Sequence, residues 1–366
     1  MKKKKVLIVS VSAGSGHVRA AQAIEQAAAA FPNAKVQHID MMDYVSAPLK
    51  TTIVDVYEQL IKRAPQLWRY LYDKADETNR MNQFYSLSKS VNRVNARAFY
   101  AFVSSFKPDH VICTHSFPAQ VLRQAKDPEL HGVPVSLVVT DYGLHRFWIV
   151  SDVAQYFVAT KKIAWELQQH GVNKKSIVVS GIPVDAAFAK RANQKQMRTT
   201  LGLPEKKTVL IMGGGVGSVQ MDDIVSLLRD QKDSKPLHVI AIAGKNEKLL
   251  KRLRAQEKIK SPVSISAFGW SNNIAEFMEA ADIVVTKSGG LTTSECIARK
   301  RMMVVVEPVP GQEERNAEFI LEHGLGLVAR SAADLLYALT QKKEYAPTYK
   351  VQPAKAAATI MKRVLA

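Results

Sequence analysis

Short apolar segments alternate along the chain with longer segments of helical periodicity. In the first half they span residues 6–12, 35–40, 110–115, 135–140, 155–160 and 176–181, and in the second half 208–214, 238–244, 263–269, 282–289 and 302–308. Each is nearly uniformly apolar and ends at Gly, Pro or a polar residue. This pattern is typical of parallel strands that helices cover on both faces. The sequence therefore predicts two Rossmann-like, doubly wound α/β domains with parallel sheets.

The length of the chain agrees with two domains, because 366 residues exceed what one core usually organises. The boundary is expected where a Gly-Ile-Pro turn and a charged, strand-poor helix precede the strand that begins at Thr208. We predict a first domain over 1–187, a second over 188–350 and a final helix over 351–366. The first domain also carries a mostly helical insertion over about 41–105.

The net charge of +18 is large for a chain of this size and indicates an anionic partner. The excess is spread along the chain without an RNA-type aromatic motif, which favours an anionic membrane surface over nucleic acid. General solubility is the alternative explanation. No apolar segment reaches the roughly eighteen residues of a membrane span, so we expect a soluble protein. Cys113 and Cys296 lie far apart in the sequence, which argues against a disulfide framework or a cysteine-rich metal site and suits a reducing cytoplasm.

Aromatic and basic residues are interleaved in the middle of the helical insertion. Aromatic rings with an apolar body and a polar edge suit the headgroup region of a bilayer, and basic neighbours suit its anionic charge. The alternative is a helical cap that packs on the first domain. The candidates for membrane contact are Lys62, Arg63, Trp68, Arg69 and Tyr72.

The loop after the first strand carries Gly14, Gly16 and His17 in front of an alanine-rich helix. A helix N-terminus disfavours the charged form of a histidine, so His17 can act as a base near neutral pH. Orientation of a phosphate is the alternative role. A dinucleotide-binding loop is the competing interpretation, which Asp40 supports, but Arg19 occupies the place of its third glycine.

In doubly wound sheets ligands bind beyond the carboxyl ends of the strands, and the second domain concentrates glycines and polar residues there. Glycines let backbone amides approach a diphosphate, a helix N-terminus favours its charge, and amide and carboxylate groups bind hydroxyls. Helix capping by acidic residues is the alternative for the last loop. The donor-site candidates are Gly214, Gly215, Gly217, Gly244, Asn246, Phe268, Gly269, Ser288, Gly289, Gly290, Thr292, Glu295, Gln312, Glu313 and Asn316.

The sequence contains no Asp-x-Asp motif and no His, Cys, Asp or Glu cluster with the spacing of metal ligands. We therefore expect neither a metal nor a cofactor. A leaving diphosphate would be neutralised by helix dipoles, loop amides and Lys245 or Lys287. Two domains facing each other would place these loops on the walls of one cleft, which is the layout of a GT-B nucleotide-sugar transferase.

Four segments together resemble glycosyltransferase family 28, and within it the diacylglycerol glycosyltransferases and monogalactosyldiacylglycerol synthases. SAGSGHVRAAQAI at 12–24 resembles the family's Gly-Gly-His opening, and TDYGLHRFW at 140–148 its Thr-Asp, His and Trp segment. KSGGLTTSE at 287–295 and EPVPGQEERN at 307–316 resemble its donor site. The resemblance covers nearly the whole chain.

The resemblance implies a GT-B fold, a UDP-sugar donor held mainly by the second domain, and inversion to a β-glycoside of diacylglycerol. It also implies a final helix that crosses back to the first domain. On the matching positions His17 would be the catalytic base, Glu295 the ribose ligand, and Gln312 and Glu313 the ligands of sugar hydroxyls. The acceptor side would be lined by Gly14, Gly16, Asp141, His145 and Trp148.

The acceptor lies in an anionic bilayer, so we expect peripheral docking to the inner face of the cell membrane, and no nucleic-acid partner. Glucose is our choice of sugar, and galactose the alternative. The number of sugars added and the oligomeric state stay open. A transferase or epimerase that uses UDP-GlcNAc and a non-catalytic UDP-sugar sensor are the competing functions.

Overall fold

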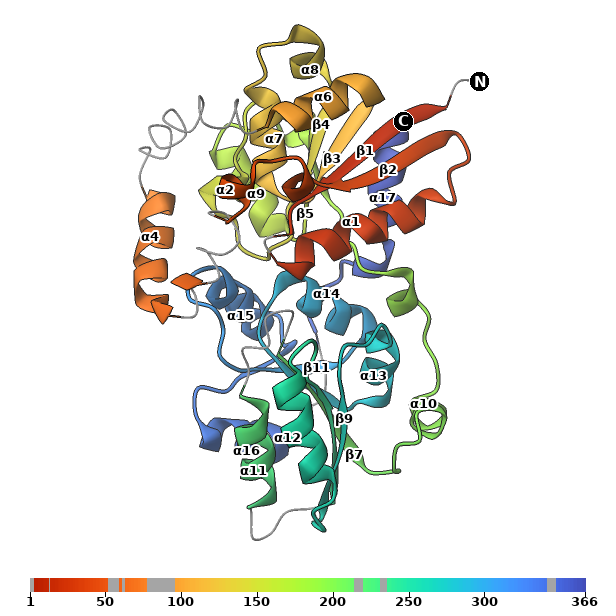
Figure 1. Ribbon diagram of the computed structural model, residues 1–366, viewed down its shortest axis with the longest axis vertical. Coiled ribbons are helices and arrows are strands. Elements are labelled where there is room, and N and C mark those ends of the chain that lie inside the picture. The colour runs from red at the N-terminus through yellow and green to blue at the C-terminus, as the bar shows by residue number, and fades with distance from the viewer. Residues whose placement is uncertain are drawn as a thin grey trace. The chain divides into compact units, whose positions relative to one another are not determined.

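The computed structural model describes residues 3–12, 14–51, 59–60, 63–77, 96–213, 220–230, 236–340 and 347–366. The chain divides into two compact units (Figure 1). Unit 1 comprises Met1–Ala186, Pro310–Gln312 and Val351–Ala366. Unit 2 comprises Ala187–Val309 and Glu313–Lys350.

The sheet of unit 1 contains six strands in the order β2-β1-β3-β4-β5-β6, and every neighbouring pair is parallel. The order reverses between β1 and β3, and this switch point is where such sheets bind ligands. The strands are β1 (Lys4–Ser10), β2 (Ala34–Asp40), β3 (His110–Cys113), β4 (Val135–Val138), β5 (Gln155–Val158) and β6 (Ile177–Val179).

Both faces of this sheet are buried. Leu7 and Ile8 are adjacent in β1 and therefore point to opposite faces, yet neither side chain is exposed. On one face, Ile8 packs in a cluster with residues of α1 and α17. The helices are α1 (Ser15–Ala28), α2 (Ala47–Thr51), α4 (Pro65–Glu77), α6 (Arg97–Phe106), α7 (Ser116–Arg123), α8 (Pro128–Gly132), α9 (Lys161–Gln169) and α17 (Pro353–Leu365), with short 3-10 turns η1 (Met41–Asp43), η3 (Arg146–Trp148) and η4 (Lys174–Ser176). A further 3-10 turn, η5 (Ala186–Ala189), spans the boundary between the two units.

Helix α17 follows unit 2 in the sequence but belongs to the core of unit 1. Its residues Ile360, Met361 and Val364 pack with Val6 and Ile8 of β1 and with α1. Nζ of Lys4 donates a hydrogen bond to the carbonyl oxygen of Val364 at 2.8 Å. The first strand of the chain and one of its last helices are thus parts of one packed core.

The sheet of unit 2 also contains six parallel strands, in the order β12-β11-β10-β7-β8-β9. Its switch point lies between β7 and β10. The strands are β7 (Lys207–Met212), β8 (Leu237–Ile242), β9 (Val263–Phe268), β10 (Ile283–Thr286), β11 (Met302–Val305) and β12 (Gly326–Val328). The helices are α10 (Gln194–Thr200), α11 (Met221–Arg229), α12 (Glu247–Glu257), α13 (Ile274–Ala280), α14 (Gly290–Arg299), α15 (Gln312–Glu322) and α16 (Ala332–Thr340).

The predicted fold class is confirmed, since each of the predicted apolar segments overlaps a strand of one of two parallel sheets. Strand β12 was not predicted, because its three residues are too few to form an apolar segment. Gly326 in this strand lies so close to β11 that a Cβ atom there would be 2.1 Å from the carbonyl oxygen of Met303. A glycine is therefore required for the pairing.

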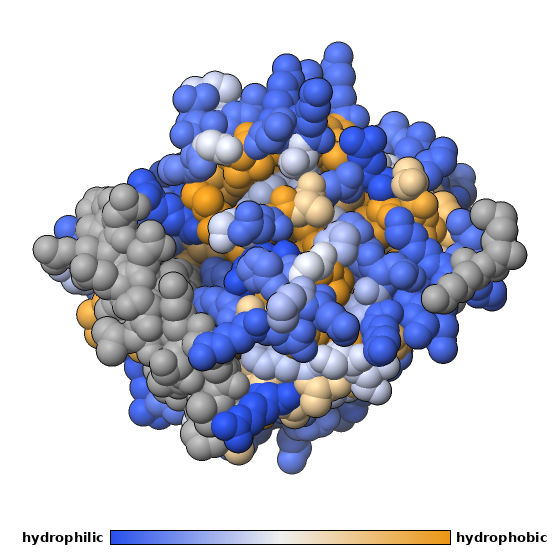
Figure 2. Space-filling model, turned by 90° about the horizontal axis from the view of Figure 1, so that it is seen from above, coloured by the Kyte–Doolittle hydropathy of each residue, from blue (hydrophilic) through white to orange (hydrophobic). Residues whose placement is uncertain are grey.

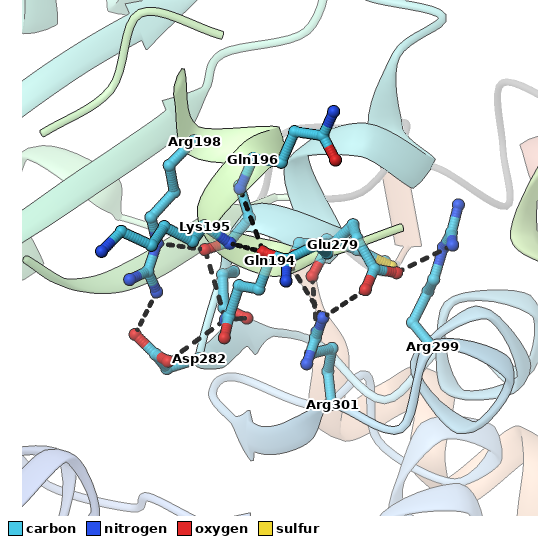
Figure 3. A network of polar contacts seen from close by, with 12 residues as sticks. Gln194, Lys195, Gln196, Arg198, Glu279, Asp282, Arg299 and Arg301 are labelled. Carbon is cyan, nitrogen blue, oxygen red and sulfur yellow. Dashed lines mark hydrogen bonds and ion pairs between the residues drawn. The ribbon is translucent and has the colours of Figure 1, made fainter. Parts of the chain in front are cut away.

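A buried network of charged residues fixes the beginning of unit 2 to its body (Figure 3). Glu279, at the end of α13, accepts from Nη1 of Arg299 at 2.8 Å and from Nη2 of Arg301 at 2.9 Å. Arg299 also donates to the carbonyl oxygen of Ala187 at 2.8 Å. Close by, Arg198 of α10 pairs with Asp282 at 2.7 Å. The segment from Ala187 to α10, which directly follows the boundary between the units, is therefore part of unit 2.

The surface seen in Figure 2 is mostly hydrophilic, as the high charge of the chain suggests. On the coloured part of this face, hydrophobic residues form separate areas between polar side chains. Among the described residues, no helix is both long enough and apolar enough to span a membrane.

Candidate active site

His17 lies in the first turn of α1, directly after the loop that leaves β1. Gly14 precedes this helix with a φ of 129°, a conformation that residues with a side chain rarely adopt. Nδ1 of His17 lies 2.8 Å from the carbonyl oxygen of Thr114, at the end of β3. The same nitrogen lies 2.9 Å from Oγ1 of Thr140, which follows β4. Residues that follow three neighbouring strands therefore meet at one imidazole.

These contacts determine which nitrogen of neutral His17 carries the proton. A carbonyl oxygen can only accept a hydrogen bond, so Nδ1 must donate to Thr114 and Nε2 carries the lone pair. Burial lowers the pKa of His17, and the opposing effects of the Asp141 charge and of the Thr114 carbonyl are smaller. At neutral pH the imidazole is therefore uncharged, and its Nε2 can accept a proton.

Two further aromatic rings, His115 and Trp148, surround His17. The ring of His115 lies edge-on to that of His17, with centroids 4.7 Å apart, and the ring of Trp148 lies 6.2 Å away. His115 was not among the predicted site residues, although its place after β3, beside the switch point, was a signal that could have identified it. His17, His115 and Trp148 thus form a compact group, in which His115 was not predicted.

Asp141 is buried beside this group and accepts two side-chain hydrogen bonds. Nε1 of Trp148 donates to Oδ2 at 3.3 Å, and Nε2 of Gln312 donates to Oδ1 at 2.8 Å. Gln312 was predicted to bind donor sugar hydroxyls in the second domain, but Pro310–Gln312 are grouped with unit 1. The amide of Gln312 is thus bound to Asp141, and its role toward sugar hydroxyls stays a prediction.

His145 is also buried, and both of its ring nitrogens are bound within the protein. One of these hydrogen bonds joins α4 to the rest of unit 1. Nε2 of His145 donates to the carbonyl oxygen of Tyr72 at 3.0 Å, and Nδ1 accepts from the amide of Phe147 at 3.1 Å. The rings of Tyr72 and His145 are 4.1 Å apart, and only 5% of Tyr72 is exposed. Tyr72 is therefore an anchor of α4, which corrects its prediction as a membrane contact.

The other membrane candidates lie on α4 or directly before it, and they differ in exposure. Trp68 is half-buried, with its ring 5.8 Å from that of Tyr72, and Arg63 and Arg69 are exposed. Lys62 lies outside the described residues. The exposed apolar side chains of α4 were not predicted: they are Leu67, Tyr70 and Leu71.

In unit 2 the end of β10 and the start of α15 are joined through Glu313. Oε1 of Glu313 accepts from Nζ of Lys287 at 2.7 Å, and Oε2 accepts from the amide of Val309 at 2.9 Å. The hydroxyl of Ser288 donates to the carbonyl oxygen of Glu313 at 2.6 Å. Glu313 was predicted to bind sugar hydroxyls, and its carboxylate is already paired with Lys287. The pair places a cation and an anion together at the switch point.

Helix α14 begins at Gly290, shortly after Lys287, and in the described part of the chain its N-cap residue Gly289 makes no side-chain cap hydrogen bond. Its first amides are therefore available to an anion. Glu295 and Asn316 are buried, and Thr292 is half-buried. The order of the strands thus brings the predicted donor residues of β10, α14 and α15 to one end of the sheet.

The remaining donor candidates follow β7, β8 and β9. Asn246 caps α12 by accepting from the amide of Leu249 at 3.0 Å, and Gly244 has a φ of 60°. Phe268 packs against Phe277 with centroids 4.6 Å apart, and a Cβ atom on Gly269 would lie 3.2 Å from Leu250. These residues have local structural roles in unit 2. Gly214, Gly215 and Gly217 lie outside the described residues.

No group of three or more His, Cys, Asp or Glu side chains in the described part of the chain is arranged to hold a metal ion. Both cysteines are buried, and burial raises the pKa of each thiol. Neither thiol is therefore a reactive thiolate.

Comparison with known families covers both units. The sequence model for monogalactosyldiacylglycerol (MGDG) synthase matches residues 17–184, and that for the glycosyltransferase family 28 C-terminal domain matches residues 208–362. The chain belongs to glycosyltransferase family 28. The predicted resemblance is thereby confirmed, and the chain is a glycosyltransferase.

Known relatives and structures agree with this assignment. The chain is 29% identical over 354 residues to the processive diacylglycerol beta-glucosyltransferase of Staphylococcus aureus strain MRSA252. The alignment covers 93% of this chain and 86% of that protein. The fold of this chain is similar to that of MurG from Acinetobacter baumannii, with a TM-score of 0.63, 14% identity and 99% of both chains covered. UDP-GlcNAc 2-epimerase from Neisseria meningitidis is similar at a TM-score of 0.61, with 14% identity and 99% of both chains covered. These two likenesses show the GT-B class of fold.

Proposed function

We propose that this glycosyltransferase moves a hexose from a UDP-hexose to the free hydroxyl of diacylglycerol, and that the hexose is glucose. The acceptor and the sugar are those in the name of the staphylococcal relatives. The observation that carries the proposal is the neutral His17, whose Nδ1–H is bound to Thr114 so that Nε2 is the basic atom. A hydroxyl acceptor needs such a base, because an alcohol is a weak nucleophile until its proton is removed.

The proposed reaction is a single displacement with inversion. Nε2 of His17 takes the proton of the lipid hydroxyl while the hydroxyl oxygen forms a bond to the anomeric carbon. The bond between that carbon and the diphosphate oxygen breaks, and UDP leaves with the electron pair. A β-glycoside results from an α-linked donor, and a proton remains on His17 until it returns to solvent.

On the donor side, we propose that the free N-terminal amides of α14 and the ammonium of Lys287 stabilise the leaving diphosphate. Lys287 is bound to Glu313, so a diphosphate would compete with this carboxylate for the cation. Glu295 is proposed to bind the ribose. With these groups the proposed reaction needs no metal ion and no cofactor.

The activity is tested with purified protein, diacylglycerol in anionic liposomes and, in separate reactions, UDP-glucose, UDP-galactose or UDP-GlcNAc. We expect a glycolipid from UDP-glucose in the presence of EDTA. A His17→Ala variant should lose about 100- to 10,000-fold in turnover, as expected for removal of a general base, while UDP binding is retained. His170→Ala is the matched control, since His170 is exposed on unit 1 at the end of α9. The absence of glycolipid from all three donors would contradict the proposal.

We further propose that the enzyme docks peripherally on the anionic inner face of the cell membrane through α4. Its exposed residues Leu67, Tyr70 and Leu71 are spaced three and four positions apart and form one face of the helix. Lys74 continues this face, with its Nζ 5.8 Å from the ring centroid of Tyr70. Large apolar side chains beside cations match the headgroup region of a bilayer with negative charge.

Docking is tested by sedimentation with vesicles of phosphatidylglycerol and phosphatidylcholine. Changing Leu67, Tyr70 and Leu71 together to serine should reduce binding at least tenfold, because about 1.4 kcal/mol, less than the full burial of one such side chain, already gives a factor of ten. The control carries Ile259→Ser and Tyr337→Ser, which remove exposed apolar side chains of unit 2. Equal binding of the two variants would exclude this face of α4.

A further inference from the structure

A second histidine, His115, stands next to His17 at the switch point of unit 1. It follows β3, the neighbour of β1, and serves as the N-cap residue of α7. Its ring is half-buried, and the centroids of the two imidazoles are 4.7 Å apart at an interplanar angle of 78°. The ring of Trp148 lies 6.1 Å from His115 and 6.2 Å from His17. The three rings therefore border the same small region.

The hydrogen bonds of the two histidines give them opposite tautomers. In His17, Nδ1 donates to the carbonyl oxygen of Thr114, which leaves the lone pair on Nε2. In His115, Nδ1 accepts from the backbone amide of Phe117 at 3.1 Å, so the proton is on Nε2. One ring therefore presents an acceptor nitrogen and its neighbour a donor N–H. In the described part of the chain, neither Nε2 atom has a hydrogen-bond partner.

His115 is also unsuited to be a competing base. Its Nδ1 lone pair is used by the cap of α7, and burial together with the nearby His17 lowers its pKa well below the ordinary value. The ring consequently stays neutral and keeps its Nε2–H when His17 gains a proton. A fixed neutral donor beside a base is suited to a substrate hydroxyl, which donates one hydrogen bond and accepts others.

We propose that His115 donates a hydrogen bond from Nε2 to the oxygen of the acceptor hydroxyl while His17 accepts the proton of that hydroxyl. The inference rests on the proposed function and adds a second residue to its acceptor site. As the O–H bond breaks, negative charge develops on the oxygen, and the His115 N–H stabilises it without any reorganisation. The same bond orients the remaining lone pair of the oxygen for attack on the anomeric carbon.

The test separates this role from that of a helix cap. His115→Asn keeps a side-chain acceptor for the amide of Phe117, because Asn is a good N-cap residue, but it removes the Nε2–H. We expect kcat for transfer to diacylglycerol to fall about 100- to 1000-fold, as for loss of one preorganised donor, with an unchanged melting temperature and unchanged UDP affinity. His115→Ala removes both functions and should also lower the melting temperature.

The outcomes are distinguishable. An inactive unmodified enzyme would contradict the proposed function itself. An active enzyme whose His115→Asn variant keeps full turnover would overturn this inference alone. A variant with weakened UDP binding and an unaffected response to the diacylglycerol concentration would overturn it as well, because His115 would then act on the donor.

Discussion

Replacement of Glu279 by alanine removes the acceptor that the buried Arg299 and the partly buried Arg301 of unit 2 share (Figure 3). Only 1% of Glu279 and 4% of Arg299 are exposed. Loss of one partner of a buried ion pair costs about 3–5 kcal/mol, because a charge is left in a medium of low polarity. In the variant Arg299 keeps its hydrogen bond to the carbonyl oxygen of Ala187, and Arg301 keeps its hydrogen bond to that of Met278. We therefore expect a loss of stability near the lower limit, about 3 kcal/mol.

A loss of about 3 kcal/mol in a unit of this size lowers the midpoint of its thermal transition by about 6–12 °C. The assay is differential scanning calorimetry of the full chain, in which the transition of unit 1 is an internal reference. Glu318→Ala, an exposed position on α15 of the same unit, is the control and should change stability by less than about 0.5 kcal/mol.

The pairing itself is tested by a double-mutant cycle with Arg299→Ala. If the two groups stabilise each other, the double variant loses less stability than the sum of the single variants by about 1–3 kcal/mol. A Glu279→Ala variant that loses less than 1 kcal/mol, or a cycle whose single effects simply add, would refute the reasoning that the buried charges depend on each other.

Three further predictions concern pH and backbone conformation. Burial lowers the pKa of His110 and of His238 to about 4. Each residue therefore contributes up to about 3 kcal/mol of stability that is present above pH 6.5 and is lost as the pH falls toward 4. Midpoints of urea unfolding that are equal at pH 7 and pH 4.5 would contradict this. For catalysis, neutral His17 is the active form, and its pKa is lowered. We therefore expect kcat/KM to reach half its maximum below pH 6.5. A midpoint at or above pH 6.5 would exclude His17 as the catalytic base. Gly311 has a φ of 82°, and an added Cβ atom would lie 2.6 Å from Cδ1 of Tyr72. The substitution Gly311→Ala should therefore destabilise unit 1 by more than about 1 kcal/mol. An unchanged calorimetric transition would show that the contact is absent.

The strands could be predicted from the sequence because buried parallel strands are uniformly apolar and end at glycine or polar residues. The switch point of each sheet then follows from the strand order, which the sequence does not reveal. The place of His17 was predictable because it directly follows the first apolar strand, but its tautomer was not. That tautomer depends on the carbonyl oxygen of Thr114, 97 positions away.

The physical cause of the altered His17 pKa also differs from the expected one. The helix N-terminus was expected to disfavour the charged imidazole, and burial among neighbouring groups is the largest cause in the structure. Burial depends on tertiary packing, which a local pattern of residues does not determine.

The orientation of α4 shows a second limit of the sequence. The helix has an apolar stripe at Trp68 and Tyr72 and another at Leu67, Tyr70 and Leu71. Both have helical spacing, so periodicity alone does not tell which one is buried. The hydrogen bond from His145 to the carbonyl of Tyr72 fixes the first stripe against unit 1.

The position of α17 also has a consequence for how the protein is made. The ribosome synthesises residues 353–365 after all of unit 2, yet Ile360, Met361 and Val364 complete the core around β1 and α1. Unit 2 can therefore finish folding while the earlier unit is still incomplete, which reverses the usual order in which domains fold during translation. Until α17 has been synthesised, the apolar side chains of α1 and β1 lack their partner. Nascent chains stalled before residue 353 should consequently be held by chaperones and be sensitive to proteases in their first half.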